Sequence, residues 1–380
     1  MDRVYLDHAA TTPLDPDVLA AMLPYLTEVH GNPSSLHASG RRARRAVEEA
    51  RERVAGVMGV RPKQVVFTSG ATEADNLALR GLLAGRPGAL VTSPLEHAAV
   101  LRTAEALAAE GRRVAHVRHG PGGAIGRAEV AAALTAAGDT ALLALMLVNN
   151  ETGVLLDAAG AAAAAHAAGA LFFCDAVQGL GLEDVSLSAL GADAVALSAH
   201  KVGGPKGVGA LVLGPGLEVA PLLAGGSQER GMRPGTHAVA PIVGMGAAVE
   251  LAEARRHEHR ARLAALRDEL ESLLTRVPGV RVNGAEAPRG AKHVNVAVEG
   301  VDGETLLMAL DDAGVEVSAG SACAAGSLEP SHVLLALGLS SREAKASVRF
   351  SLGYGTTAEE VRYAAERFAT VVDRCRAVAA

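Results

Sequence analysis

The chain has 380 residues, of which 49% are hydrophobic and 21% charged, a composition that predicts a folded protein with one large and one smaller domain. Thirty-six Lys and Arg against 42 Asp and Glu give a net charge of −6, which argues against a general nucleic-acid or anionic-membrane binder. Three cysteines without a CxxC pair indicate neither a disulfide framework nor a zinc site, so a reducing cytoplasm is expected. We expect neither a targeting signal nor a membrane span.

Short β-rich runs alternate with alanine- and leucine-rich helical stretches between Val65 and about Leu213. Strands are expected at VVFT, ALVTS, RVAHV, ALLALMLV, ALFFC and AVALS. The alanine-rich stretch at 158–170 is expected to be a helix. This alternation predicts an α/β domain with a mainly parallel sheet flanked by helices.

A charged, periodic stretch from Glu250 to about Arg276 predicts a long helix that leads out of the α/β domain and ends before a Pro-Gly turn. Strand-like RVNG and HVNVAV, a helix from about Glu304, strand-like VEVS, the loop SAGSACAAGS and an amphipathic helix from Ala358 follow. We therefore expect a large domain over residues 14–255. Residues 1–13 and 256–380 are expected to form a small α+β domain.

Two residues near predicted strand ends have side chains suited to cofactor chemistry. Lys201 lies where a buried strand meets a glycine-rich turn, and a desolvated lysine there can act as a Schiff-base nucleophile, although isolated lysines usually lie on the surface. Asp175 directly follows the run ALFFC, at the sheet edge where α/β proteins gather ligands, and Gln178 comes three residues later. A carboxylate there suits the pyridine nitrogen of pyridoxal phosphate (PLP), and an Asp that only caps a loop is the alternative.

The segment VVFTSGATEADN places Ser69-Gly70-Ala71-Thr72 at the start of a helix that directly follows a strand. Helix N-termini bind phosphate through their free N–H groups, and a simple helix cap explains the segment equally well. Neither GxGxxG nor GxxxxGK[ST] occurs at this turn, which argues against a dinucleotide-binding dehydrogenase and against an ATP site.

Ten segments in a fixed order together resemble a known family. They are YLDHAATTP, GNPSSLHASG, FTSGATEADN, EHAAV, NNETG, DAVQ, SAHKVGGPKGVG, GGSQERGMRPGTHAV, GSACAAGSLEPSHVLLALG and VRFSLG. Over nearly its whole length the chain resembles the cysteine desulfurases of the NifS/IscS type, which are class V aminotransferase-like PLP enzymes of fold-type I. The resemblance implies a large domain with a seven-stranded, mainly parallel sheet and a smaller α+β domain.

The resemblance also implies how PLP is held. Lys201 matches the Schiff-base lysine, Asp175 the partner of the pyridinium nitrogen, Gln178 the partner of the phenolic oxygen and His97 the imidazole that stacks on the ring and assists proton transfer. The remaining cofactor-binding positions surround the phosphate and are Ala71, Thr72, Ser198, His200 and Thr236. Because the residue matched by Thr236 reaches across from a second subunit, the resemblance implies a homodimer with shared active sites.

Substrate recognition is assigned by the same resemblance to Arg349 and Asn150, near the carboxylate of L-cysteine. An Arg fork suits a carboxylate, and alternation in the strand places Arg349 opposite its two apolar neighbours. Cys323, in the expected loop 318–329, matches the nucleophile that takes sulfur as a persulfide and releases alanine. A free thiol with a pKa of about 8.5 is mostly protonated, so loop closure is expected to activate it. Cys174 and Cys375 are assigned no role.

The long cysteine loop is typical of desulfurases that hand sulfur to a protein, such as an iron–sulfur scaffold or a tRNA thiolation enzyme. No resident metal is expected, and Cys323 is a candidate transient iron–sulfur ligand. Ala319 and Ala324-Ala325 make the loop less polar than is common in the family. The alternatives are a selenocysteine lyase or another class V aminotransferase-like enzyme, from which Cys323 discriminates, and a non-enzymatic scaffold for iron–sulfur assembly partners, which would bind no PLP.

Overall fold

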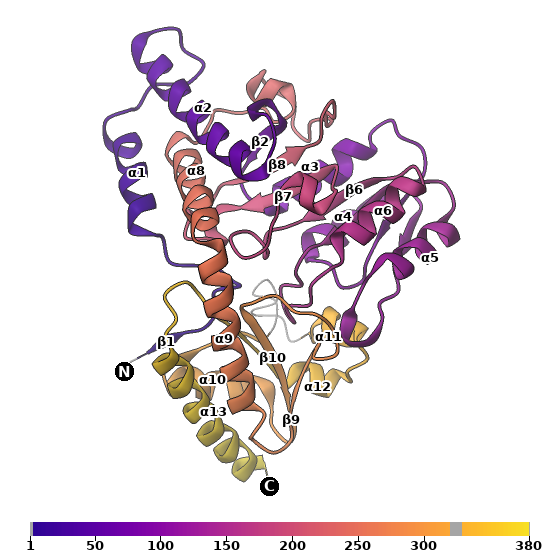
Figure 1. Ribbon diagram of the computed structural model, residues 1–380, viewed down its shortest axis with the longest axis vertical. Coiled ribbons are helices and arrows are strands. Elements are labelled where there is room, and N and C mark those ends of the chain that lie inside the picture. The colour runs from indigo at the N-terminus through magenta and orange to yellow at the C-terminus, as the bar shows by residue number, and fades with distance from the viewer. Residues whose placement is uncertain (1–2, 320–328, 380) are drawn as a thin grey trace.

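The computed structural model describes residues 3–319 and 329–379, with side chains up to residue 377. Figure 1 shows two parts, a larger one at the top built on a sheet and a smaller one at the bottom that holds both chain ends. Helix α8 (Val239–Ala254) lies in the upper part, and α9 (Arg256–Leu274) continues from it into the lower part. Within the described residues, no helix combines the length and apolar character that a membrane span requires.

The large part contains a seven-stranded sheet with the order β2-β8-β7-β6-β5-β3-β4. Only β8 runs antiparallel to its neighbours β2 and β7, which confirms the predicted mainly parallel sheet. The strands are β2 (Val65–Thr68), β3 (Ala89–Thr92), β4 (Val114–His116), β5 (Thr140–Met146), β6 (Leu171–Asp175), β7 (Ala194–Ser198) and β8 (Gly209–Leu213).

Helices cover both faces of this sheet, which is why its strands read as nearly continuous apolar runs. Alternate residues of the same strands enter two cores, so that Phe172 packs with one face and Phe173 with the other. The first core lies under α2 (Ala38–Met58), α5 (Arg127–Ala137), α6 (Ala158–Ala167) and α8, and α1 (Pro16–Thr27) packs on α8. The second lies under α3 (Ala71–Leu83) and α4 (Ala98–Ala109). The short α7 (Leu187–Leu190) precedes β7.

The small part has its own sheet and its own core. Strands β9 (Val280–Val282), β10 (His293–Val298) and β12 (Ser347–Ser351) form an antiparallel sheet in the order β12-β10-β9. Helices α9, α10 (Gly303–Asp312) and α13 (Ala358–Ala379) pack in this part, and α11 (His332–Ala336) and α12 (Ser341–Lys345) lie beside it. The start of the chain belongs here, because β1 (Val4–Tyr5) pairs with β11 (Val315–Glu316). The domain limits at residues 13 and 255 stay a prediction.

The predicted single helix over 250–276 is wrong in one respect. Residues 250–254 are the end of α8, and α9 begins at Arg256 after a break at Arg255, where φ is −101° and ψ is 0°. The break has a packing reason, because α8 contacts α1 and α2 in the large part whereas α9 contacts α13 in the small part. The predicted helix from Ala358 is confirmed as α13.

Candidate active site

A cavity of about 490 Å³ lies at the carboxyl ends of β5, β6 and β7, against the start of α3. Thr236 and Cys323 apart, all the residues predicted to bind cofactor or substrate line this cavity: Ala71, Thr72, His97, Asn150, Asp175, Gln178, Ser198, His200, Lys201 and Arg349. The chain therefore folds these residues from six separated segments into one concave site.

Lys201 follows β7, and two backbone carbonyls of the N-terminal segment hold its amine. Lys201 Nζ donates to Ala9 O at 2.6 Å and to Ala10 O at 2.8 Å. Gln178 Nε2 also donates to Ala9 O, at 3.0 Å, while Gln178 Oε1 has no partner among the described residues. These carbonyls keep both side chains oriented into the cavity.

Asp175 ends β6 with its side chain buried, and its Oδ1 accepts a hydrogen bond from Val177 N at 3.0 Å. Burial raises the pKa of Asp175, while nearby His97 and Lys201 oppose that shift. His97 caps α4, and its Nδ1 accepts from Ala99 N at 3.1 Å. That bond fixes the orientation of the imidazole ring.

Two buried carboxyls near Asp175 were not singled out from the sequence. Asp75, on α3, is 1% exposed, lines the cavity and has no hydrogen-bond partner among the described residues. Glu96 is also 1% exposed, and its Oε1 accepts from Met146 N at 3.1 Å. Burial raises the pKa of each well above its ordinary value. Like charges this close in a dry site cannot all ionise, so we expect Asp75 and Glu96 to be protonated.

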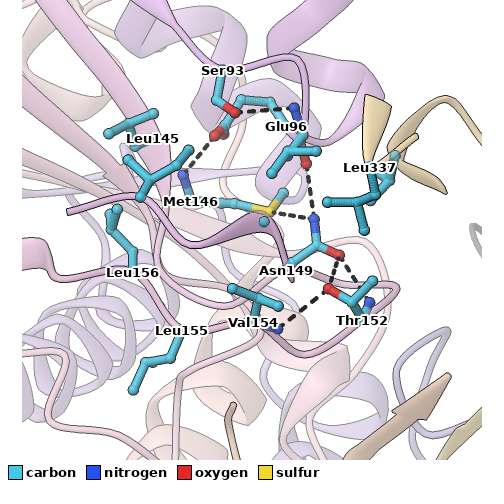
Figure 2. Close-up of a pocket in the computed structure, with 14 residues that line it drawn as sticks. Ser93, Glu96, Leu145, Met146, Asn149, Thr152, Val154, Leu155, Leu156 and Leu337 are labelled. Carbon is cyan, nitrogen blue, oxygen red and sulfur yellow. Dashed lines mark hydrogen bonds between the residues drawn. The ribbon is translucent and has the colours of Figure 1, made fainter. Parts of the chain in front are cut away.

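Figure 2 shows the turn from Asn149 to Thr152, which contains Asn150, beside a second, mostly apolar pocket of about 30 Å³. Asn149 Nδ2 donates to Leu95 O at 2.9 Å, and its Oδ1 accepts from the backbone amides of Glu151 at 3.0 Å and Thr152 at 2.9 Å. The buried side-chain amide of Asn149 thus pairs with backbone amides of the turn and holds Asn150 at the cavity wall. The second pocket is far smaller than the cavity of about 490 Å³ that holds the predicted site residues.

The other end of the cavity suits an anion. Helix α3 begins at Ala71, so the amides of its first turn face the cavity wall where His200 and Ser198 also lie. A Cβ at Gly209 would lie 2.6 Å from the carbonyl carbon of Gly70, so only glycine allows β8 to pass this turn. Burial, with nearby Lys201, lowers the pKa of His200 to about 4, which keeps the imidazole neutral.

Arg349 lies on β12 with a side chain that is 1% exposed to solvent, and the strand alternation predicted for it is confirmed by its buried apolar neighbours. Its Nη1 donates to Asn150 O at 2.9 Å and its Nη2 to Asp7 Oδ1 at 2.7 Å. Arg349 Nε and Asn150 Oδ1 have no partner in the described part of the chain. An oriented guanidinium with a spare donor suits a carboxylate.

The residues present fit PLP, as judged from this geometry. A buried carboxylate at Asp175, an amine at Lys201, the spare amide oxygen of Gln178 and the amide-rich start of α3 converge on one cavity. These are the acid partner, the nucleophile, the polar ring contact and the phosphate cradle that PLP requires. Fold and cavity together define a fold-type I PLP enzyme.

Comparison with known proteins places the chain more closely. The aminotransferase class-V family matches residues 4–363, and the chain belongs to this family. Cysteine desulfurase 2 of Trichormus variabilis is 42% identical over 100% of this chain and 95% of the relative, and a cysteine desulfurase of Cereibacter sphaeroides is 45% identical over 100% and 98%. Within the family, the chain belongs with these cysteine desulfurases.

Solved structures agree with this placement. A NifS-like protein shares 34% sequence identity and a TM-score of 0.90, with 98% of this chain and 100% of that chain covered. The structure of SspA in complex with cysteine shares 34% identity and a TM-score of 0.80, with 92% and 98% covered. The similarity therefore extends over both parts of the fold.

Two predicted site residues lie outside the cavity or outside the described residues. Thr236 is exposed on the surface and does not line the cavity, so its role in a second copy stays a prediction. Cys323 lies outside the described residues, but the base of its loop is anchored at the site. Ser318 pairs with Arg349 through backbone hydrogen bonds of 2.7 and 3.2 Å, and Ser331 Oγ donates to Glu151.

Proposed function

We propose that the chain binds PLP and converts L-cysteine to L-alanine, with the sulfur transferred to Cys323 as a persulfide. One observation carries this proposal: Lys201, Asp175 and Arg349 line a single cavity, and the described start of the cysteine loop is paired with Arg349 itself. A thiol delivered from that loop would meet a substrate whose carboxylate is bound by the same arginine.

PLP, when bound, would supply an electron sink for the bond changes at the substrate's Cα and Cβ. Asp175 would hold the ring nitrogen and Lys201 Nζ would bind the cofactor. The amine of Lys201, once released, would take the Cα proton, and His97 would assist proton transfer. Arg349 and Asn150 orient the substrate carboxylate, which aligns the substrate sulfur for attack.

The sulfur transfer itself belongs to Cys323. Its thiolate attacks the substrate sulfur, so that an S–S bond forms while the Cβ–S bond breaks and its electron pair stays with the carbon fragment. Protonation of that fragment gives alanine. The outer sulfur of the persulfide then passes to an acceptor protein, for which an iron–sulfur scaffold in the cytoplasm is our first candidate, and Cys323 is a candidate transient ligand of the cluster.

A homodimer completes the proposed site. The start of α3 with Ala71 and Thr72, together with Ser198 and His200, would hold the phosphate in one copy, and Thr236 of the second copy would add a hydroxyl donor. The exposure of Thr236 on a surface segment supports this arrangement, because a residue in the cavity of its own chain could not reach another copy.

The substitution Cys323→Ala tests the function. The variant should keep PLP bound and lose alanine formation from L-cysteine by at least about 1,000-fold, because removal of a nucleophile leaves only slow background chemistry. Cys375→Ala, a thiol on α13 outside the cavity, is the matched control and should behave as the parent. Unchanged turnover in Cys323→Ala would instead indicate a selenocysteine lyase or another enzyme of the family that needs no thiol.

A further inference from the structure

The surface segment 227–237 has a strained backbone, although it lies on the outside of the large part. Among the described residues, only Glu229 (φ 46°) and Arg230 (φ 58°) combine a positive φ with a residue other than glycine. Such a backbone conformation is unfavourable for a residue other than glycine and persists only where surrounding contacts hold it. The contacts of Glu229 identify what holds the backbone of this segment in place.

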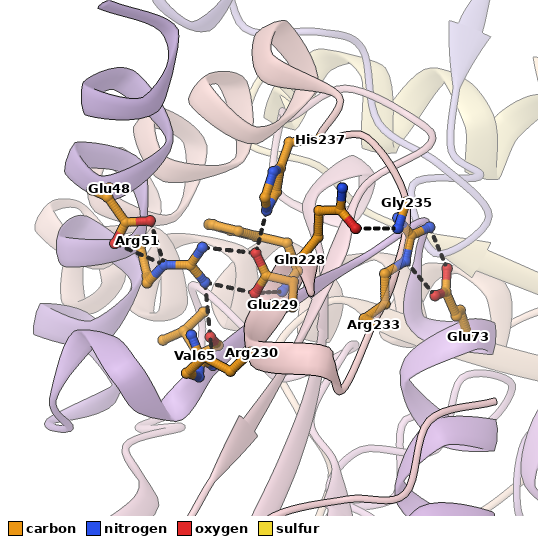
Figure 3. A network of polar contacts seen from close by, with 11 residues as sticks. Glu48, Arg51, Val65, Glu73, Gln228, Glu229, Arg230, Arg233, Gly235 and His237 are labelled. Atoms are coloured by element: carbon orange, nitrogen blue, oxygen red, sulfur yellow. Dashed lines mark hydrogen bonds and ion pairs between the residues drawn. The ribbon is translucent and has the colours of Figure 1, made fainter. Parts of the chain in front are cut away.

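Figure 3 shows Glu229 at the centre of a buried polar network. Arg51, on α2, donates to both its oxygens at 2.7 Å, His237 Nε2 contacts Oε1 at 2.7 Å, and Phe67 N donates to Oε2 at 3.0 Å. The side chains of Glu229 and Arg51 are 1% and 4% exposed. Burial alone would raise the pKa of Glu229, but hydrogen bonds from His237 and Arg51 lower it to about 2, so the carboxylate is charged.

The same network covers the outer edge of the large sheet. Strand β2 is the terminal strand, so its outward backbone groups have no neighbouring strand within the described part of the chain. Val65 O accepts from Arg51 Nη1 and from Arg230 Nη2, each at 2.9 Å, and Phe67 N is bound by Glu229. The segment therefore takes the place of a further strand and cannot shift without leaving buried polar groups unpaired.

Two further contacts hold the part of the segment that leads to Thr236. Gly235 N donates to Gln228 Oε1 at 3.1 Å, and Arg233 Nε donates to Glu73 Oε1 at 2.7 Å. Thr236 itself stays exposed between these anchors and His237. Thr236, the residue proposed to reach a second copy, is thus an exposed residue of a segment that is hydrogen-bonded to β2 through Glu229 and Arg230.

We propose that Glu229 is a positioning residue, whose buried carboxylate locks residues 227–237 so that Thr236 is presented to the active site of a second copy. This inference rests on the proposed function, in which Thr236 binds the phosphate of PLP across the dimer. The distinguishing consequence is that a substitution of Glu229 should weaken PLP binding in the partner's site and leave PLP binding in the site of its own chain unchanged.

Glu229→Gln keeps the shape of the side chain and removes its charge. In the homodimer it should weaken PLP binding about 10- to 100-fold, the loss expected for one charge-assisted hydrogen bond to phosphate. Glu110→Gln, which removes a two-bond pair with Arg80 on an exposed surface, is the matched control and should bind PLP as the parent does. If Glu229→Gln does not fold, His237→Leu removes one bond and leaves the Arg51 pair, and a smaller loss in the same direction is expected.

Hybrid dimers show whether Glu229→Gln weakens PLP binding in the partner's site or in the site of the chain that carries the substitution. In the first hybrid, one copy carries Lys201→Ala together with Glu229→Gln and the other is the parent; in the second, one copy carries Lys201→Ala and the other Glu229→Gln. The readout is PLP fixed to the remaining Lys201 by borohydride after dialysis, quantified by mass. We expect the first hybrid to lose PLP and the second to retain it.

If the second hybrid loses PLP and the first retains it, or if both retain equal amounts, Glu229 has no positioning role and the proposed function still stands. A parent protein that binds no PLP, or one that binds it as a monomer, would overturn the proposed sharing of sites and this inference with it. Parent homodimers and dimers of Lys201→Ala alone, measured in parallel, separate these results.

Discussion

Three buried carboxyl groups, those of Asp75, Glu96 and Asp175, lie so close together that Asp175 adds to the effect of burial in raising the pKa of the other two. Asp75 and Asp175 line the active-site cavity, and only Asp175 has an assigned partner in the chemistry. Asp75 forms no hydrogen bond among the described residues, and burial, with Asp175 nearby, raises its pKa well above the ordinary value. A carboxyl kept neutral beside Asp175 leaves the negative charge on the residue that is proposed to hold the ring nitrogen.

The substitution Asp75→Asn tests this protonation state. The folded-state pKa of Asp75 lies above the unfolded value of 3.8, so folding takes up a proton and the free energy of unfolding falls as pH rises above that value. Asn does not titrate, so the variant should gain stability relative to the parent as pH rises above about 4 and match it at lower pH.

Urea unfolding of the PLP-free protein at several pH values measures this difference, with Asp312→Asn on the exposed end of α10 as the control for the substitution. A variant that loses stability relative to the parent as pH rises would mean that Asp75 is ionised in the folded protein.

Sequence reasoning found the residues with recognisable chemistry and missed those that act through contacts. Lys201 and Asp175 stand out because an amine or carboxylate at a strand end is unusual. The carbonyls of Ala9 and Ala10 give no signal, since every residue has a carbonyl and only the fold brings these two to Lys201. Asp75 could have been noticed as an acid on the apolar face of a predicted helix.

At the scale of elements, the close passage of β8 under the turn before α3 sets the shape of the phosphate end. A Cβ at Gly209 would approach the backbone of Gly70 to 2.6 Å, and backbone cannot move aside as a flexible side chain can. Gly209→Ala should therefore cost about 1–3 kcal/mol of stability through overpacking and weaken PLP binding by displacing the turn.

Thermal unfolding with and without PLP checks this expectation. Gly56→Ala is the control, since Gly56 lies in α2 with open space around its missing Cβ and should gain about 0.5–1 kcal/mol. If Gly209→Ala binds PLP as tightly as Gly56→Ala does, the turn before α3 has no part in the phosphate site.

The strands β2 to β7 of the large sheet were predicted, because burial on both faces of a sheet gives short continuous apolar runs, as in β5 and β6. Strand β8 was not among the predicted strands. The break between α8 and α9 was not predicted either, because both sides of Arg255 have helical composition. It arises from two different packing partners, which only the folded chain supplies.

At the scale of the whole molecule, the site depends on segments that are far apart in the chain. Asp7 from the N-terminal segment, Asn150 from the large part and Arg349 from the small part form one bonded group at the cavity. The loop that carries Cys323 begins where Ser318 pairs with Arg349. The fold thus links substrate binding to the base of the loop that is proposed to deliver the nucleophile.

The central claim is that Cys323 receives sulfur from L-cysteine, and the most direct measurement is mass spectrometry of the Cys323 peptide. PLP-loaded protein is incubated with L-cysteine in the absence of reductant and digested. We predict one added sulfur atom on the Cys323 peptide, formed together with alanine, and none on the peptides of Cys174 and Cys375. Alanine formed with no added sulfur on Cys323 under these conditions would contradict the account.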